Sequence, residues 1–296
     1  MRVVISGASG LIGTALSASL REGGHSVVAL VRRQARSADE SSWAPAAGTI
    51  DLDVIASADA IVNLAGASIG ARRLTSSYQQ VVRQSRVDST STIARAIVQA
   101  KPDAVLLQGS AMGYYGSRGE EPLSERSSSG QTFLASICRD WEAAAVPAQD
   151  AGARVVYLRT GLVLAPHGGF AERLLPLVRR GLISSLGSGR AWHSWISLQD
   201  AIRALEFHLT SGHHGASNVI APVAVRDRPL ITALCEAMGT SPGLSVPAWA
   251  MRLAVGPAAD DLLNSQLASP GVLNRLGFTW DHAQIDAAAR WIVTPD

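Results

Sequence analysis

With 296 residues, 47% of them hydrophobic, the chain is long enough for one large domain or two smaller ones with a proper core. Its formal net charge is +2, and no basic stripe, transmembrane-length apolar run or signal peptide is visible, so neither nucleic acid nor a membrane is expected as a partner. The two cysteines, Cys138 and Cys235, form no metal or redox motif, which favours a cytoplasmic protein without a metal site.

The first forty residues predict a strand, a tight turn and a helix. The β-branched run at residues 3–5 ends in three glycines spaced by three, Gly7, Gly10 and Gly13, and apolar residues at helical spacing follow. Gly7 suits a sharp turn, Gly10 lets a diphosphate approach the backbone, and Gly13 allows close packing of helix on strand. Since free N–H groups at the helix start would face phosphates, this stretch predicts a dinucleotide site, with a ligand-free turn as the alternative. Residues 26–31 read as the second parallel strand.

The residues after that second strand distinguish the two common dinucleotides. NAD sites usually place an acid there to bind the ribose 2′-hydroxyl. Here the strand ends in Arg32 and Arg33, and the first carboxylate is Asp39. A guanidinium suits a 2′-phosphate, so the pattern favours NADP(H); the alternative is a solvated pair of arginines on a loop.

Strands and helices alternate through the first 165 residues. We expect further strands at 59–65, 104–108 and 155–158, helices at 76–100 and 131–149, and loops at 34–50 and 120–130. This order predicts an α/β fold with a doubly wound parallel sheet. Ligands of such sheets collect at the carboxyl ends of the strands, where Gly66, Ser110 and Arg159 are expected.

Beyond residue 165 the pattern changes to short helices and glycine-rich links. A helix at 198–209 and a strand at 217–220 are expected to rejoin the sheet, and three or four short helices are expected from Arg228 onward. We therefore expect a dinucleotide-binding Rossmann domain at 1–165, rejoined by 195–220. The segments 166–194 and 221–296 are expected to form a smaller lobe over the substrate cleft.

Several motifs together resemble the extended short-chain dehydrogenase/reductases. More closely, they are similar to the "epimerase family protein" group, also called the SulA-like or atypical SDR39U group, over essentially the whole chain. The motifs are the glycine turn, Asn63 to Gly66, Ser110 to Gly116, Trp141-Glu142, Arg159 to Gly161, Gly187 to Arg190, Trp195-Ile196, Val246 to Ala248 and Asn274 to Phe278. Ser197 departs from the Trp-Ile-His usual in this group, which leaves any role of that imidazole in doubt here.

The resemblance implies an NADP(H)-binding fold with a C-terminal lobe. It adds contacts from Arg32, Leu64, Ala65, Arg86 and Leu162, although Arg86 could equally be a charge on a helix face. With these, the cofactor-binding candidates are Gly7, Ser9, Gly10, Leu11, Ile12, Gly13, Arg32, Arg33, Leu64, Ala65, Gly66, Arg86, Ser110 and Leu162.

The catalytic Tyr-x-x-x-Lys pair of ordinary superfamily members is not expected in this chain. Alignment of the helix through Trp141 places Leu134 and Cys138 at the two positions, and Lys101, the single lysine, precedes a strand at the opposite end of the sheet. Ser110 and Tyr115 are the best remaining candidates for the chemistry. For Ser110 a local backbone-capping role has equal weight.

Two further residues are candidates for contacting substrate. Arg159 at a strand end could bind an anionic group, or be an ordinary rim arginine. His193, between two tryptophans, could be an acid or base, although such a histidine is more often structural.

Two functions remain open from the sequence. The first is an NADP(H)-dependent oxidoreductase, or a nucleotide-sugar epimerase-like enzyme, acting on a small carbonyl or hydroxyl compound. The second is a non-catalytic NADP(H)-binding sensor or regulatory protein; some relatives are associated with cell or organelle division. We expect a small-molecule substrate and a monomer or homodimer in either case.

Overall fold

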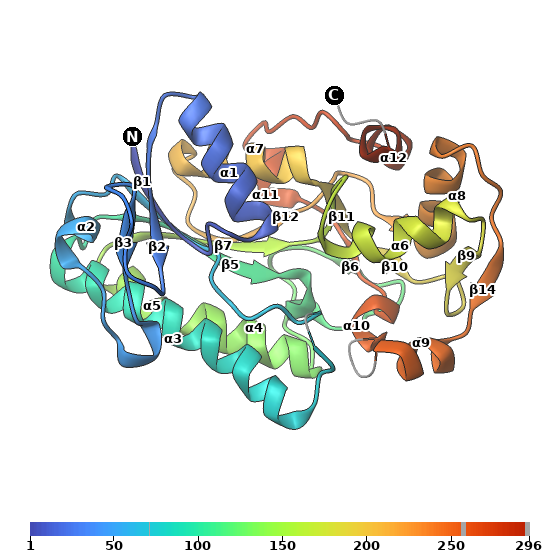
Figure 1. Ribbon diagram of the computed structural model, residues 1–296, viewed down its shortest axis with the longest axis horizontal. Helices are drawn as coiled ribbons and strands as arrows, with labels where there is room; N and C mark the ends of the chain where they lie inside the picture. The colour runs from blue at the N-terminus through green and yellow to red at the C-terminus, as the bar shows by residue number, and fades with distance from the viewer. Residues whose placement is uncertain (71, 256–258, 294–296) are drawn as a thin grey trace.

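The computed structural model describes residues 1–70, 72–255 and 259–293. A seven-stranded sheet lies at its centre, in the order β12-β7-β5-β4-β1-β2-β3 (Figure 1). Every neighbouring pair is parallel, which confirms the doubly wound sheet. The strands are β1 (Arg2–Ser6), β2 (Ser26–Val31), β3 (Glu40–Ser42), β4 (Ala60–Asn63), β5 (Val105–Ala111), β7 (Arg154–Thr160) and β12 (Gly215–Val219).

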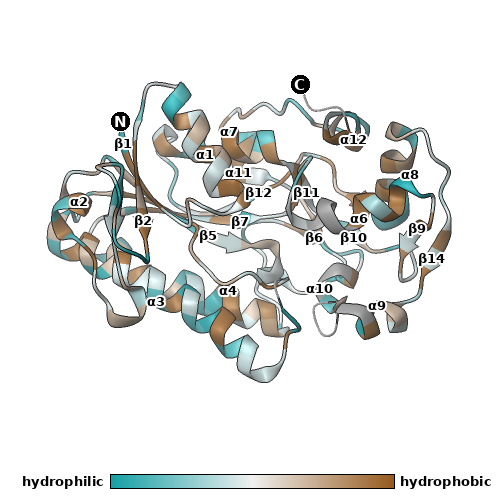
Figure 2. Cartoon of the chain, viewed as in Figure 1, coloured by the Kyte–Doolittle hydropathy of each residue, from teal (hydrophilic) through white to brown (hydrophobic). Residues whose placement is uncertain are grey.

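Helices cover both faces of this sheet. Alternation along β1 sends Val3 and Ile5 to a cluster with α1 (Leu11–Glu22) and α7 (Leu198–Thr210). Val4 points to the opposite cluster, with α2 (Leu52–Ala56), α3 (Ser76–Ala100) and α5 (Val146–Asp150). Figure 2 shows the hydrophobic residues along β1 and β2 that both clusters use. The strands are thus buried on both sides, as expected for a parallel sheet.

Two elements differ from the sequence-based expectation. β3 lies inside the expected loop at 34–50, because its three residues, Glu40-Ser41-Ser42, carry no apolar signal and pair only at the sheet edge. The expected helix at 131–149 is two helices, α4 (Phe133–Ala143) and α5. Pro147 stands in the first turn of α5, where its missing N–H prevents one continuous helix.

Parts of the chain beyond residue 163 build a second core, seen on the right of Figure 1. Leu164, Val178, Ile231 and Ile292 are among its buried members. Five helices of the described ranges follow residue 226, where three or four were expected from Arg228. The additional elements are α6 (Gly169–Arg179), α8 (Asp227–Ala237), α9 (Ala248–Val255), α10 (Ala259–Leu263), α11 (Gly271–Arg275), α12 (Ile285–Val293), β6 (Pro122–Leu123), β8 (Leu162–Leu164), β9 (Ile183–Leu186), β10 (Trp192–His193), β11 (Trp195–Ser197), β13 (Val225–Arg226), β14 (Leu244–Val246) and β15 (Leu267–Ala268), with 3-10 turns at Pro45–Ala47 and Met112–Tyr115.

Four small sheets join these pieces. β8 pairs with β11, β9 with β14 and β6 with β15, all parallel, while β10 pairs with β13 antiparallel. The β6–β15 pair brings the chain near residue 267 back beside the loop that follows β5. Within the part of the chain that the structure describes, no helix is both long and apolar enough to cross a membrane.

A buried histidine joins α7 to β12. The His208 imidazole has no exposed surface, and its Nε2 and Nδ1 lie 2.9 Å and 3.1 Å from the hydroxyls of Ser217 and Ser211. Burial lowers the pKa of His208 from its ordinary value of 6.5 to about 4, with smaller contributions from the nearby charges of His213 and Arg154. The folded protein therefore holds this imidazole neutral where the unfolded chain would protonate it.

Acid is consequently expected to destabilise the fold through His208. Because the folded pKa is the lower one, the stabilisation is complete above about pH 6.5 and is lost as the pH falls towards 4, by up to about 3 kcal/mol. Urea unfolding of the wild type and of His208→Gln between pH 7 and pH 4 measures this. The Gln variant should lose less stability on acidification; parallel pH curves would contradict the assignment.

Candidate functional site

Each of the three glycines of the first turn meets a different steric constraint. Gly7 has a φ of +72°, and a Cβ there would lie 2.7 Å from the carbonyl carbon of Leu64, so a side chain is excluded twice. A Cβ on Gly13 would lie 2.2 Å from the Gly7 oxygen, which shows how closely α1 approaches β1. Gly10 is different, because a Cβ there would meet only the Gly7 oxygen, at 3.3 Å. Gly10 therefore leaves the approach to the helix start open.

The first turn of α1 offers free backbone donors. Gly10 N–H donates to the Gly7 oxygen, but the N–H groups of Leu11, Ile12 and Gly13 have no acceptor in the described ranges, and no side chain caps the helix. Ser9 and Gly10 are exposed beside them. Three donors and the positive end of a twelve-residue helix fit a phosphate group.

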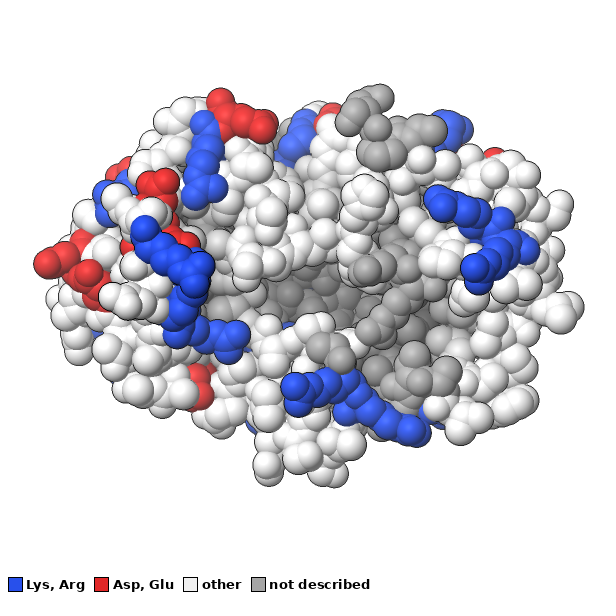
Figure 3. Space-filling model, in the orientation of Figure 1, with Lys and Arg blue, Asp and Glu red and all other residues white. Residues whose placement is uncertain are grey.

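The two arginines after β2 have different partners. Arg33 forms a two-pronged ion pair with Glu40, with N–O distances of 2.7 Å and 2.5 Å, and the N–H of Arg36 donates to the same carboxylate. The hydrogen bond from Arg33, chiefly, lowers the pKa of Glu40 to about 2. Arg32 is exposed, and across the described ranges no hydrogen bond or ion pair engages its side chain. Figure 3 shows Lys and Arg side chains gathered over the carboxyl end of β2, beside the hollow in this face.

Arg86 belongs to α3, and its side chain reaches Gly66 in the segment that follows β4. In that segment Leu64 and Ala65 are half-buried and Gly66 is exposed. Its guanidinium donates to the carbonyls of Ala67 and Val82, at 2.9 Å and 3.0 Å, and lies 4.9 Å from the centre of the Trp141 ring. Burial lowers the pKa of Arg86. No carboxylate of the described residues pairs with this half-buried cation, whose side chain lies beside Gly66.

Polar side chains hold the adjacent strand ends in place. Asn63 at the end of β4 accepts from the Ser6 hydroxyl and donates to Thr90 and Gln108, at 2.5 Å, 2.9 Å and 2.9 Å. All four residues are buried. This satisfied network ties together the carboxyl ends of β1, β4 and β5.

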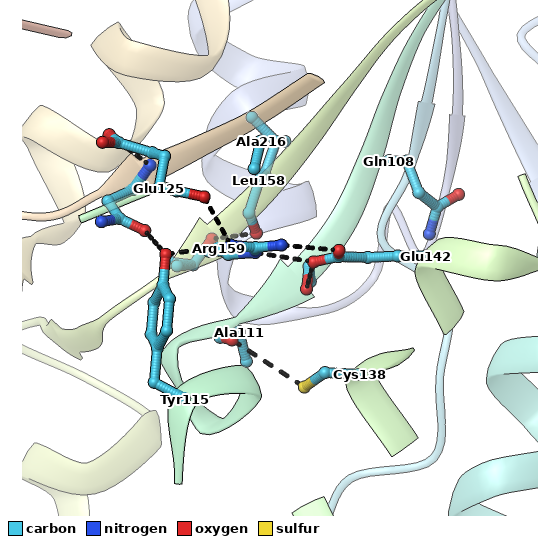
Figure 4. Close-up of polar contacts among 12 residues, drawn as sticks. Gln108, Ala111, Tyr115, Glu125, Cys138, Glu142, Leu158, Arg159 and Ala216 are labelled. Carbon is cyan, nitrogen blue, oxygen red and sulfur yellow. Dashed lines mark hydrogen bonds and ion pairs between the residues drawn. The ribbon is translucent and has the colours of Figure 1, made fainter. Parts of the chain in front are cut away.

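Ser110 and Arg159 are direct neighbours in the sheet, and Glu142 of α4 joins them. The Ser110 hydroxyl donates to Oε1 of Glu142 at 2.7 Å. Arg159 donates to both carboxylate oxygens, from Nε and Nη2, each at 2.9 Å. Figure 4 shows this pairing of Arg159 with Glu142. A carboxylate nearly removed from water is thus ion-paired and accepts three hydrogen bonds.

The remaining contacts of Arg159 point towards Tyr115 (Figure 4). Its Nη1 donates to the Tyr115 oxygen at 3.0 Å and to the Glu125 carbonyl at 3.2 Å, and its guanidinium lies 3.5 Å from the centre of the Tyr114 ring. The Tyr115 hydroxyl donates to Asn218 at 2.7 Å. Burial, above all, raises the pKa of Tyr115 to about 12. The phenol is a satisfied, buried hydrogen-bonding group in this arrangement.

Comparison with known proteins adds the family. The model of the NAD dependent epimerase/dehydratase family matches residues 3–221, and that of a domain of unknown function, DUF1731, matches residues 246–292. The chain belongs to the NAD-dependent epimerase/dehydratase family.

Relatives within this epimerase family cover the whole chain. An epimerase family protein of Mycobacterium bovis is 42% identical over 294 residues, which are 99% of this chain and 97% of that protein. Mouse epimerase family protein SDR39U1 is 31% identical over 305 residues, covering 99% of this chain and all of that protein. A crystal structure of human SDR39U1 (isoform 2) with NADPH superposes with a TM-score of 0.90 at 28% identity, over the full length of both chains. The expected resemblance to the SDR39U group is thereby confirmed.

Two further candidates from the sequence, Leu162 and His193, lie in the small sheets beyond β7. Leu162 is half-buried in β8, and its N–H donates to the Ser194 oxygen at 2.9 Å. His193 lies in β10, with its Nε2 3.2 Å from the carboxylate of Asp227. The structure therefore brings Ser110, Tyr115 and Arg159 together and gives His193 a separate, nearly buried partner.

Leu134 and Cys138, which the sequence analysis aligned with the Tyr-x-x-x-Lys pair, and Lys101 lie in different parts of the fold. Leu134 and Cys138 lie on α4, and the Cys138 sulfur is 3.8 Å from the Ala111 oxygen. Lys101 follows the last residue of α3 and precedes the amino end of β5. Glu142 was part of a recognised motif but carried no assigned role, and its contacts with Ser110 and Arg159 cross 32 and 17 residues of sequence. The Trp141-Glu142 motif was the one feature of the sequence that could have indicated this role of Glu142.

Proposed function

We propose that this family member binds NADP(H) in the glycine-turn crevice and is an oxidoreductase or epimerase-like enzyme acting on a small hydroxyl or carbonyl compound. The observation that carries the NADP(H) assignment is the difference between Arg32 and Arg33. Arg33 is held by Glu40, whereas Arg32 is exposed and uncommitted at the end of β2. A free guanidinium at this position matches a 2′-phosphate.

The residues of this chain fit the rest of such a cofactor. The unpaired N–H groups of Leu11, Ile12 and Gly13 would receive the diphosphate, and Arg86 beside Gly66 would receive a further polar part. Leu64, Ala65 and Leu162 would supply apolar contacts. A bound nicotinamide supplies two-electron redox chemistry at a carbon that carries oxygen. The human SDR39U1 structure contains NADPH, which supports the assignment.

Replacing Arg32 by alanine is expected to reduce the preference for NADPH over NADH by about tenfold to a hundredfold, the scale of a hydrogen-bonded charge pair. Thermal shifts at matched concentrations of each dinucleotide report the affinities. Arg33→Ala is the matched control, because it removes the same side chain one residue away and breaks only local contacts, with Glu40 and the Gln34 carbonyl. Equal loss of preference in both variants, or none in Arg32→Ala, would reject the special role of Arg32.

A second candidate is a non-catalytic NADP(H)-binding sensor or regulatory protein, including a role in cell division. It is favoured by Leu134 and Cys138 on α4 and by the raised pKa of Tyr115, which makes this phenol a poor proton donor at neutral pH. A panel of small carbonyl compounds, followed by NADPH absorbance, separates the two. Turnover above the background of Ser110→Ala supports the enzyme; its absence, with NADPH bound, supports the sensor. We place either in the cytoplasm, as a monomer or homodimer.

A further inference from the structure

The direction of one hydrogen bond determines what Ser110 can offer to a ligand. Glu142 receives two N–H groups of Arg159, each at 2.9 Å, and its side chain is 13% exposed. A carboxylate held in this way is ionised and can only accept hydrogen bonds. The Ser110–Glu142 contact of 2.7 Å therefore uses the single hydroxyl proton of Ser110.

What remains on Ser110 is a pair of oxygen lone pairs. A ligand group that meets the Ser110 oxygen at the carboxyl end of β5 must then donate a hydrogen bond. A carbonyl oxygen has no proton to donate, and it would face the lone pairs of Ser110 without a bond. A ligand hydroxyl has the proton and satisfies this oxygen.

Both carboxylates near Ser110 already have hydrogen-bond partners, so neither is left to bind an ammonium group of a ligand. The charge of Glu142 is compensated by Arg159 in direct contact. The second carboxylate of this region, Glu125, accepts the backbone N–H groups of Asn218 and Val272 at 3.2 Å and 3.0 Å. Figure 4 shows Arg159 between these two acidic residues. The cluster already holds its own cation.

From these contacts we infer that Ser110 and Glu142 form a hydroxyl-recognising pair, so that the site binds the alcohol form of its ligand in preference to the carbonyl form. Glu142 is a positioning residue in this arrangement, since it acts by orienting the hydroxyl of Ser110. The inference rests on the proposed function and narrows its substrate class to compounds bearing a hydroxyl group at this point.

Matched alcohol and ketone probes test this without turnover. Binding of cyclohexanol is measured with the NADPH-loaded protein and binding of cyclohexanone with the NADP⁺-loaded protein, by ligand-observed NMR, and 1-phenylethanol with acetophenone gives a second pair. The quantity compared among variants is the ratio of the dissociation constants of the ketone and the alcohol. The two probes are measured with cofactors of different oxidation state, but this difference affects the ratio equally in every variant. The wild type is expected to favour the alcohol by about fivefold to tenfold, the worth of one hydrogen bond.

Three variants make the test specific. Ser110→Ala removes the oxygen that accepts from the alcohol. Its preference for the alcohol over the ketone should therefore fall about fivefold to tenfold relative to the wild type. The double variant Glu142→Met/Arg159→Met removes the ion pair as a unit, which buried pairs tolerate better than loss of one partner. It frees the Ser110 hydroxyl to donate to a ketone as well as to accept from an alcohol, so the preference for the alcohol should fall. Glu121→Gln, the same loss of charge at a carboxylate paired with Arg118, is the control and should leave the ratio unchanged.

The outcomes separate this inference from the proposed function. If NADPH does not bind, or binds while neither probe pair does, the proposed function is rejected and the inference with it. If the probes bind the wild type but Ser110→Ala keeps its ratio, only the hydroxyl-recognising pair is rejected. A fallen ratio in Ser110→Ala, with Glu121→Gln unchanged, supports the pair even if the double variant does not fold.

Discussion

Replacing Asp200 by alanine is expected to lower the free energy of unfolding by about 3–5 kcal/mol, the cost of removing one partner from a buried ionic network. Asp200 has no exposed surface. Its Oδ1 accepts from Arg203 at 3.0 Å and from the backbone N–H of Asp281 at 2.8 Å. Its Oδ2 accepts from the Ser197 hydroxyl at 3.1 Å and the backbone N–H of His282 at 2.9 Å.

Two of these four contacts, those from the N–H groups of Asp281 and His282, fasten the start of α7 to the segment that leads into α12. Without the carboxylate, the N–H groups of Asp281 and His282 lose their acceptors in a buried place, which is why the penalty exceeds that of an ordinary surface pair. Urea unfolding monitored by tryptophan fluorescence gives the change, since Trp280 and Trp291 flank this segment.

Asp281→Ala is the matched control for Asp200→Ala. Its carboxylate also pairs with Arg203, at 2.8 Å, but the side chain is 43% exposed. Loss of a pair that is solvated in this way should cost no more than about 1 kcal/mol. Equal destabilisation by the two variants would show that the buried position of Asp200 carries no special weight.

The local parts of the fold follow from short stretches of sequence. The run Ser26–Val31 and the helix Ser76–Ala100 have the bounds expected, because their apolar periodicity and flanking breakers lie within the segment itself. β3 could not be recognised in this way, since Glu40-Ser41-Ser42 becomes a strand only by pairing with β2. Tertiary pairing decides such short edge strands.

The side-chain partners of the candidate site were beyond the reach of sequence. Arg32 and Arg33 are equivalent in the sequence, and only the fold shows that Glu40 takes Arg33. Ser197 replaces a histidine expected from the resemblance, yet an imidazole lies beside it, because His282 Nδ1 is 3.0 Å from its hydroxyl across 85 residues. Such contacts depend on how distant elements pack, which periodicity does not encode.

Gly13→Ala is expected to lower the free energy of unfolding by about 3 kcal/mol or more, the upper range for overpacking a close contact. The new Cβ would lie 2.2 Å from the Gly7 oxygen and 2.8 Å from the Ala8 Cα. Neither backbone can retreat easily, because Gly7 itself lies against Leu64 on its other side, where a Cβ would approach within 2.7 Å. The gain in helix propensity from Gly to Ala, up to about 1 kcal/mol, is too small to offset this clash.

The same substitution at Gly10 separates stability from ligand binding. A Cβ at Gly10 has only one neighbour, the Gly7 oxygen at 3.3 Å, so Gly10→Ala should change the unfolding free energy by less than about 1 kcal/mol. Its methyl group would nevertheless stand beside the free N–H groups of Leu11 and Ile12, and thermal stabilisation by NADPH should fall sharply. Gly13→Ala should lose both fold stability and the NADPH response. A stable Gly13→Ala protein, or a Gly10→Ala protein with the full NADPH shift, would show that close strand–helix contact and phosphate access do not govern these two positions.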